Sequence, residues 1–215
     1  MRMLEPLLPD TLREEELTDC IERVLDADQD EDIEGFLFED GFMGGHSAKR
    51  LEFHGCKFER CRFSPVEIKY LYFVDAVFVG CDFSNMRFHG AGFQRARFVD
   101  CRCTGADFSE CVLNQVSFEG CLMDYANFSM GKLTNVKLSD CSCVHAAFDS
   151  LKLKGVALTG CKLMESEWLH TPLKGVDLRG NDLSAFHIDP VDLRGAVISA
   201  DQALILAALL GVVIR

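Results

Sequence analysis

The stretch FHGAGFQRARFVDC, residues 88–101, places a phenylalanine at every fifth position, at Phe88, Phe93 and Phe98. An α-helix repeats every 3.6 residues and a β-strand every two, so neither element would bring these three rings to one face. The spacing therefore predicts a chain that turns after every short extended segment.

The same five-residue period runs through most of the chain. Thirty successive units from Phe53 to Ile198 carry a large apolar residue or a cysteine, and a second, usually smaller series lies two residues earlier in each unit. Positions two apart on an extended chain point the same way, so each unit carries an inward-facing pair. Ten of the twelve glycines between residues 51 and 200 lie two residues after the large apolar position. A chain that bends there needs a residue free to take a positive φ.

The cysteines indicate the length of one full circuit. Six of them are spaced by twenty residues in the small inward position: Cys61, Cys81, Cys101, Cys121, Cys141 and Cys161. Four five-residue sides make one coil of a square solenoid, and twenty-residue spacing stacks these cysteines on one face. Coils stack at about 4.8 Å, so seven and a half coils give a rod roughly 36 Å long.

Short segments of the repeat resemble a known family. CDFSN, AGFQR, ADFSE and ANFSM match the A(D/N)LXX pattern of pentapeptide-repeat proteins, and VDLRG occurs at 176–180 and at 191–195. The resemblance covers about 150 of the 215 residues. It implies an all-β fold, the right-handed quadrilateral β-helix, which agrees with the square inferred from the spacing.

Three regions follow from this pattern. Residues 1–50 form an acidic N-terminal cap, where a capping box of Thr11 and Glu14 predicts a helix over 12–25. Phe38 and Met43 already have the phase of the repeat, so degenerate coils begin there. Residues 51–198 form the β-helix. Residues 199–215 form a closing helix, which begins at a second capping box and is followed by the strand-like VVIR.

The closing helix is apolar nearly all round, so the end of the rod can cover only part of it. Its segment resembles the C-terminal segment of Qnr-like fluoroquinolone-resistance proteins, a group within the family that dimerises there. The alternative is an ordinary monomeric cap. We favour a homodimer, formed through Leu204, Ile205, Leu206, Leu209, Leu210, Val212, Val213 and Ile214.

The sequence indicates no enzyme and no cofactor. It contains no phosphate-binding loop and no G-x-S-x-G motif, and the six histidines mostly take outward positions. Ten of the eleven cysteines fall on inward positions, which favours reduced core thiols and a cytoplasmic location. Two CxC pairs, Cys101–Cys103 and Cys141–Cys143, lie two coils apart, roughly 10 Å, too far for one tetrahedral zinc. Neither a signal peptide nor a membrane span is visible.

The charge is concentrated at one end and on one face. Of the net charge of −12, residues 1–50 contribute −10 and residues 51–200 contribute −2. A duplex 36 Å long carries roughly 21 negative charges, so the whole rod is not DNA-like in net charge. Sorting by face, however, gives one face of net −4 and a neighbouring face of net +3. The acidic face carries Glu67, Asp107, Glu110, Asp149, Glu167 and Asp189 against Lys69 and Arg87.

The resemblance to Qnr-like proteins implies a partner. Members of that group bind DNA gyrase and topoisomerase IV as mimics of duplex DNA, without binding nucleic acid themselves. The unbroken phase of residues 51–200 leaves no room for projecting loops, so the chain looks more like the loopless chromosomal members. The acidic face is the expected binding surface. The alternative is a non-catalytic interaction scaffold with an unrelated partner, which the near-neutral repeat favours.

Overall fold

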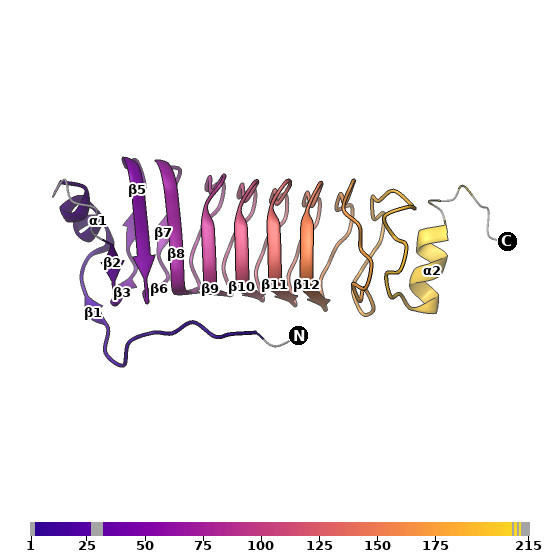
Figure 1. Ribbon diagram of the computed structural model, residues 1–215, viewed down its shortest axis with the longest axis horizontal. Coiled ribbons are helices and arrows are strands. Elements are labelled where there is room, and N and C mark those ends of the chain that lie inside the picture. Colours follow the sequence, from indigo (N-terminus) through magenta and orange to yellow (C-terminus); the bar gives the residue numbers. More distant parts are fainter. Residues whose placement is uncertain (1–2, 27–31, 208, 210, 212–215) are drawn as a thin grey trace.

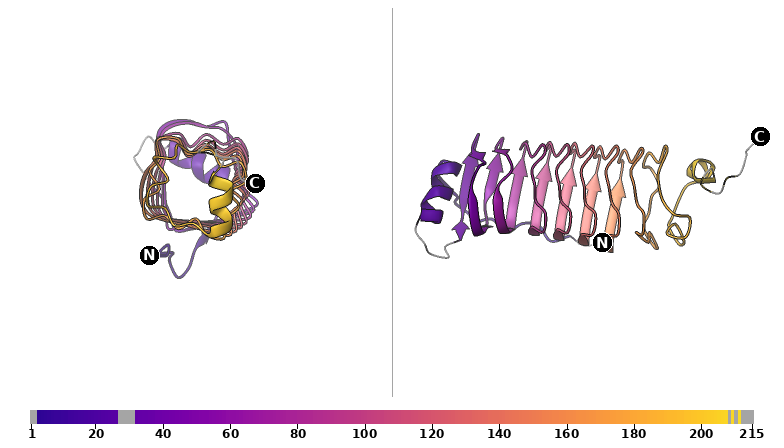
Figure 2. Two further views of the ribbon diagram at one scale, coloured as in Figure 1. Left: turned by 90° about the vertical axis from the view of Figure 1, so that its right-hand side faces the viewer. Right: turned by 90° about the horizontal axis from the view of Figure 1, so that it is seen from above.

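The structure is a computed structural model, and it describes residues 3–26, 32–207, 209 and 211. The chain folds as a four-sided β-solenoid with a helix at each end (Figures 1 and 2). The first part contains β1 (Arg13–Glu14), α1 (Leu17–Asp26), β2 (Ile33–Glu34), β3 (Phe36–Glu39) and β4 (Phe42–Met43). The early coils contain β5 (Ser47–His54), β6 (Lys57–Glu59), β7 (Arg62–Phe63) and β8 (Glu67–Val79). The later coils contain β9 (Gly92–Val99), β10 (Val112–Glu119), β11 (Lys132–Ser139), β12 (Lys152–Thr159) and α2 (Ala200–Ala207).

The coils stack in parallel with a register of twenty residues. Val112 of β10 lies opposite Gly92 of β9 on one side and Lys132 of β11 on the other. On the sides without long strands, isolated bridges such as that between Arg87 and Asp107 keep the same spacing. The square coil predicted from the phenylalanine and cysteine spacing is therefore confirmed.

The inward pairs fill the axis of the rod. Phe98 is fully buried, and its ring stacks between Phe78 and Phe118 with centroid distances of 4.6 Å on both sides. Cysteines fill the small positions, and the Cys101 thiol lies 3.5 Å from the Phe78 carbonyl, to which it donates. Burying each large side chain contributes about 1.5–3 kcal/mol, so a continuous apolar column stabilises the whole solenoid.

The corners of the coil require a left-handed backbone. Gly90 has a φ of 71°, but Glu110 at the equivalent corner and Tyr125 at a neighbouring corner also take positive values, 58° and 60°. Among the described residues, seventeen that are not glycine share this conformation. It is unfavourable for residues with a Cβ, so the stacking of the coils imposes it.

Proline removes the corner at residue 65. Pro65 fixes φ near −65° and cannot take the left-handed conformation, so the chain leaves the square there. β8 has thirteen residues and reaches its first left-handed corner only at Asp75 (φ 53°), and Glu67 pairs with Ser47 of β5. Neither Arg50 nor Tyr70 takes a positive φ, so these two coils lack a regular fourth side, although the sequence phase is unbroken.

The N-terminal helix begins later than the expected residues 12–25. The structure has α1 at Leu17–Asp26, while Arg13 and Glu14 are extended as β1 and pair in parallel with Phe36 and Leu37. The capping-box pattern is therefore not used, because these residues cover the exposed edge of β3 instead. Parallel pairing of the coils begins at Ile33, which lies opposite Phe53.

An extended arm, residues 3–12, runs back along the outside of the rod (Figure 1). The Leu4 N–H donates to Gln115 Oε1 at 3.0 Å, and the Leu7 N–H donates to Asp75 Oδ1 at 2.9 Å. Burial raises the pKa of Asp75, but hydrogen bonds from Arg95 and from the Leu7 N–H outweigh it and lower this pKa below its usual range. The arm is thus fixed to one corner of the solenoid.

The C-terminal helix uses its predicted capping box. The Ser199 N–H donates to Gln202 Oε1 at 3.0 Å, and the buried Gln202 amide donates to the Leu178 and Asn181 carbonyls. The expected strand VVIR lies outside the described residues. No helix in the described part of the chain is long and apolar enough to cross a membrane.

Candidate partner-binding surfaces

One side of the rod carries a ladder of outward residues in strict register. We call this side, built on Phe88, Phe108, Phe128, Phe148 and Trp168, the acidic face. Isolated parallel bridges join its ladder residues in the order Arg87, Asp107, Asn127, Ala147, Glu167 and His187. Because each step is one coil, the ladder is parallel to the rod axis, and its two carboxylates, Asp107 and Glu167, lie on it three coils apart.

The acidic residues differ in whether their carboxylates also accept hydrogen bonds from the backbone. Asp107 Oδ1 accepts from the Ser109 N–H at 3.0 Å, and Asp149 Oδ1 accepts from the Leu169 N–H at 2.8 Å, so both also hold the backbone. Glu110 is exposed and reaches His89 only at 4.0 Å. Glu167 is exposed and has no ion-pair partner among the described residues. The last two carboxylates are therefore the ones most available to a partner.

The structure does not bring all six expected residues together. Asp107, Glu110, Asp149 and Glu167 lie on the acidic face. Glu67 lies instead on the straight segment of β8, which has no bridge to the Arg87 ladder. Asp189 is exposed just beyond the ladder, where its carboxylate accepts from the Val191 N–H at 3.0 Å.

Exposed apolar side chains border the acidic face, and the sequence reasoning missed them. Tyr125 and Met130 stand at its two corners on the same coil, with 63% and 58% of their surfaces exposed. The Tyr125 ring stacks on His145 at 4.8 Å, and His145 Nδ1 lies 3.4 Å from Glu165. The available signal was an apolar residue at an outward position of the repeat.

The neighbouring side is basic toward the C-terminal end. Its cations are all exposed, and none has an ion-pair partner in the described part of the chain: Lys132, Lys152, Lys154, Lys174 and Arg194. The charge asymmetry expected between adjacent faces is therefore present in the arrangement of the residues.

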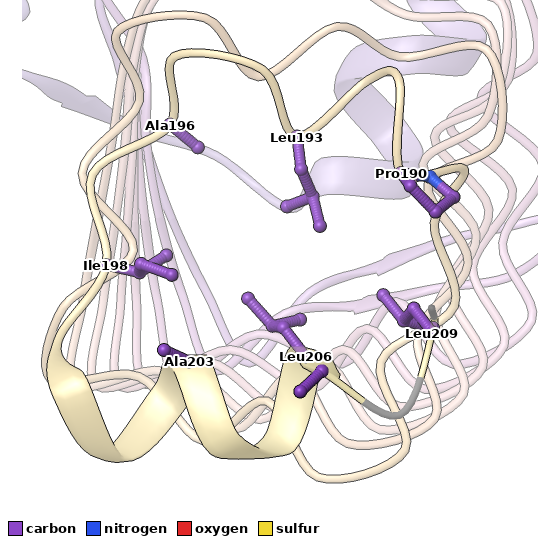
Figure 3. A pocket seen from close by; sticks show the side chains of 8 residues that line it. Pro190, Leu193, Ala196, Ile198, Ala203, Leu206 and Leu209 are labelled. Atoms are coloured by element: carbon purple, nitrogen blue, oxygen red, sulfur yellow. The ribbon is translucent and has the colours of Figure 1, made fainter. Parts of the chain in front are cut away.

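The C-terminal end of the rod contains an apolar hollow of about 300 Å³. Figure 3 shows Leu193 and Ala196 from the last coil pointing toward Leu206 and Ala203 of α2 across it. The last coil and α2 therefore enclose apolar surface without filling it.

The expected dimerisation residues divide into two sets. Leu206 is buried against the end of the coil and Leu209 is partly buried, so both belong to the intramolecular cap. Leu204 and Ile205 are 61% and 40% exposed and face outward. The expected contacts Leu210, Val212, Val213 and Ile214 lie outside the described residues.

One group of side chains has metal-ligand character. Ligand atoms of Asp32, Glu52 and His54 lie within 4.8 Å of one another. Arg50, however, contacts both carboxylates, at 3.0 Å to Asp32 and 2.9 Å to Glu52. We assign this group as an ion-pair network that joins the first coil to the second, because the Arg50 guanidinium already contacts both carboxylates that a cation would need.

The CxC cysteines lie in the core. Burial raises the pKa of the Cys103 and Cys143 thiols well above the ordinary value. All eleven cysteines are buried and unpaired. Neutral thiols are poor zinc ligands, since zinc takes thiolates.

Comparison with known proteins identifies the repeat. A family model described as pentapeptide repeat region matches residues 51–128 and 91–168. A trypsin-treated variant of QnrB1, a plasmid-mediated fluoroquinolone resistance protein, is 23% identical, with 86% of this chain and 92% of that chain covered and a TM-score of 0.37. HetL, a pentapeptide-repeat protein involved in heterocyst differentiation regulation in the cyanobacterium Nostoc, is 15% identical, with coverage of 86% and 97% and a TM-score of 0.26. No curated protein matches the chain.

Proposed function

The chain belongs to the pentapeptide-repeat family, and on this premise we propose that it is a non-catalytic protein that binds a type II topoisomerase, DNA gyrase or topoisomerase IV, in place of duplex DNA. Binding would modulate the enzyme and alter its response to quinolones. The partner is inferred from the resemblance of the sequence to Qnr-like proteins. The acidic face supplies the charged side chains that would contact this partner.

The observation that carries the proposal is the straight acidic ladder. Asp107 and Glu167 stand in one register, and Glu110 and Asp149 lie beside it, against a single arginine at the end, Arg87. A DNA-binding groove is lined by basic residues arranged to meet a regular line of phosphates. Asp107 and Glu167 on the ladder, with Glu110 and Asp149 beside it, offer such a groove negative charge, as the phosphates do, along a fixed direction.

The exposed apolar corners strengthen this surface. Charged contacts favour fast association and correct orientation, whereas aromatic side chains near the centre of an interface provide much of the binding energy. Tyr125 and Met130 lie midway along the acidic face, between Asp107 and Asp149. The surface can therefore bind a basic groove more tightly than its charge alone allows.

We also propose that two copies join through their C-terminal ends. The apolar hollow and the exposed Leu204 and Ile205 lie at this end of the rod. A second copy would cover this apolar surface and shield the end of the solenoid. The dimer would present two acidic faces on one longer rod.

The first test is DNA supercoiling by purified bacterial gyrase with increasing amounts of the protein, with and without ciprofloxacin. We expect inhibition, or relief of the drug effect at lower protein concentration. The affinity should fall as salt concentration rises, because the contact is electrostatic.

A pair of charge-reversal variants locates the surface. Glu110→Lys with Glu167→Lys changes the acidic face without removing a carboxylate that holds the backbone. Asp100→Lys with Asp140→Lys makes the same change in net charge at the diagonally opposite corner, where both residues are also exposed. We expect the first variant to weaken the effect on gyrase at least tenfold and the control to leave it within twofold. No effect of the wild-type protein at micromolar concentration would favour a scaffold with an unrelated partner instead.

A further inference from the structure

β12 is an open strand edge in the middle of the rod. It pairs with β11 on one side and ends the strand order of the ten-stranded sheet. The next coil passes the same two sides as residues 172–180. Among the described residues, no backbone hydrogen bond or bridge joins residues 153–160 to that segment. The row of arrows in Figure 1 accordingly ends at β12, although the chain makes further coils.

Earlier coils show which bonds are missing. The Gly55 N–H donates to the Val74 carbonyl at 3.0 Å, and the Gly120 N–H donates to the Ser139 carbonyl at 2.9 Å. The equivalent donors in the coil of β12 are Gly155, which matches Gly55, and Gly160, which matches Gly120. Within the described chain neither has such a bond to the next coil. Unpaired backbone groups along a strand edge are a template for another strand.

Two buried side chains hold the next coil at the ends of the gap. Thr171 Oγ1 accepts from the Leu151 N–H at 3.0 Å. Asn181 Oδ1 accepts from the Cys161 N–H at 2.8 Å, and its amide donates to the Leu158 carbonyl at 3.2 Å. Side chains thus take the place of direct backbone pairing at both ends, and the backbone between them stays open.

The gap is a cleft of about 650 Å³. Its walls come from β12 and from the following coil: Val156, Ala157, Leu158, Thr159, Gly175, Asp177, Arg179 and Gly180. Leu153 and Val156 are partly exposed, whereas Leu133 and Val136, one coil earlier, are 3% and 0% exposed. The gap therefore leaves Leu153 and Val156 partly uncovered, while Leu158, Leu173 and Leu178 beside them stay buried.

Two free cations flank the cleft at the same register. Lys154 on β12 and Lys174 on the next coil are exposed, and neither has an ion-pair partner among the described residues. Arg179 is different, because it pairs with Asp177 at 2.7 Å. An acidic side chain placed between the two lysines would meet both.

We propose that this cleft, the β12 slot (residues 153–160 and 172–180), binds one extended peptide strand from an acidic partner protein. The strand lies parallel to β12 and takes hydrogen bonds from the open backbone, as in β-strand addition. Its inward side chains are aliphatic and cover Leu153 and Val156, and an outward carboxylate sits between Lys154 and Lys174. The slot lies on sides of the rod other than the acidic face, so this binding does not depend on the topoisomerase proposal.

The test uses an eight-residue fluorescent peptide with the sequence of β11, in which Lys132 and Lys137 are replaced by serine and Thr134 by glutamate. In the protein, β11 pairs with the edge of β12 that lies opposite the slot, so its sequence matches the register of β12. The glutamate falls in register with Lys154 and Lys174. A control peptide also carries proline at the positions of Leu133 and Val136, which removes two N–H donors and the strand conformation. We expect micromolar binding of the first peptide by fluorescence anisotropy and at least tenfold weaker binding of the control.

Two protein variants separate the slot from general charge. Lys154→Glu with Lys174→Glu should weaken peptide binding at least tenfold. Lys132→Glu with Lys162→Glu makes the same change in net charge away from the slot and should change it less than twofold. All four lysines are exposed, so both variants are expected to fold.

Amide hydrogen exchange reports on the slot itself. In the free protein, the amides of Leu153, Gly155 and Leu158 should exchange faster than those of Leu133, Asn135 and Leu138, and the peptide should slow them. Equal protection of the two sets in the free protein would mean that the coil is closed in solution, and this overturns the proposal. So would equal binding of both peptides, or no binding of the first at millimolar concentration.

Discussion

At the scale of the single residue, stability depends on the backbone angle at each corner of the coil. Gly90 and Ser150 stand at equivalent corners of the acidic face, with φ of 71° and 55°. The N–H of each donates to the next coil, Gly90 to Ser109 and Ser150 to Leu169. The two positions therefore differ mainly in whether a Cβ is present at a left-handed corner.

Substitution at these corners should change stability in opposite directions. Nothing lies within 4 Å of a Cβ built on Gly90, so Gly90→Ala should cost about 1 kcal/mol through the backbone alone. Ser150→Gly should stabilise by about 0.5–1 kcal/mol for the same reason. Urea denaturation followed by circular dichroism measures both. A stabilising Gly90→Ala would contradict the account of the corners.

The aromatic column gives a second residue-scale prediction. Phe98 is fully buried between two stacked rings. Phe98→Ala should cost about 3–5 kcal/mol, because it removes the ring and leaves a cavity. Phe98→Leu should cost clearly less, since leucine fills the equivalent position at Leu138 and Leu158 in later coils. An equal loss of unfolding free energy for the two variants, measured by urea titration, would show that the aromatic column tolerates no change of side-chain shape.

Sequence reasoning was most successful at this scale. The inward positions of phenylalanine and cysteine follow from a period of five, because only one side of each short segment can face the axis. The loss of the corner at Pro65 could also have been found, since proline excludes a positive φ. The exposed position of Tyr125 could be read from the phase, but its stacking on His145 depends on side-chain rotamers that the phase does not determine.

At the scale of the element, α2 is fixed to the rod by one buried amide. Gln202 is 2% exposed, and it accepts from Ser199 while donating to the Leu178 and Asn181 carbonyls. The capping box was predictable from two residues three apart. The two bonds to the preceding coil were not, because they join segments more than twenty residues apart in sequence.

Replacing this amide should detach the helix. Gln202→Met keeps the size of the side chain but leaves buried carbonyls unpaired, at a cost of about 2 kcal/mol or more. Trp168, the only tryptophan, is buried near this end and stacks on Phe148 at 4.2 Å, so its fluorescence reports the change. Leu204→Met on the exposed side of α2 is the control and should be neutral. An unchanged urea midpoint for Gln202→Met would show that the helix is held by apolar contacts alone.

Elements at the ends of the rod were harder to predict than the repeat. A capping box suggested a helix from residue 12, but the edge of the first coil is covered by β1, so the helix begins at Leu17. The available signal for the β12 slot was polar residues in the small inward series after β12, namely Ser166, Thr171 and Asn181, although the large inward residues there are apolar as expected. Whether neighbouring coils pair depends on Thr171 and Asn181, two buried polar residues whose partners appear only in three dimensions.

At the scale of the whole molecule, the proposed function depends on the straightness, charge and length of the rod. The acidic and basic sides are neighbours on one rigid rod, so the direction in which a basic groove can bind is restricted. The C-terminal end would determine length in the proposed dimer, because joining two copies there would double the number of acidic faces and let one particle contact both halves of a two-fold symmetric enzyme.

Leu204 and Ile205 provide the test of this dimer. Leu204→Lys with Ile205→Lys places two charges on exposed apolar positions and should leave the fold of each chain intact. The variant should therefore still unfold cooperatively on heating, as a folded monomer does. Light scattering after size exclusion should give twice 24.0 kDa for the wild-type chain and 24.0 kDa for the variant. Leu4→Lys with Leu7→Lys is the control, because those side chains are 50% and 71% exposed on the N-terminal arm, beside β8 and β10 and not beside α2, and should not affect assembly. A wild-type mass of 24.0 kDa at micromolar concentration would contradict the dimer. If the monomeric variant inhibits gyrase with unchanged potency, one acidic face is enough for binding.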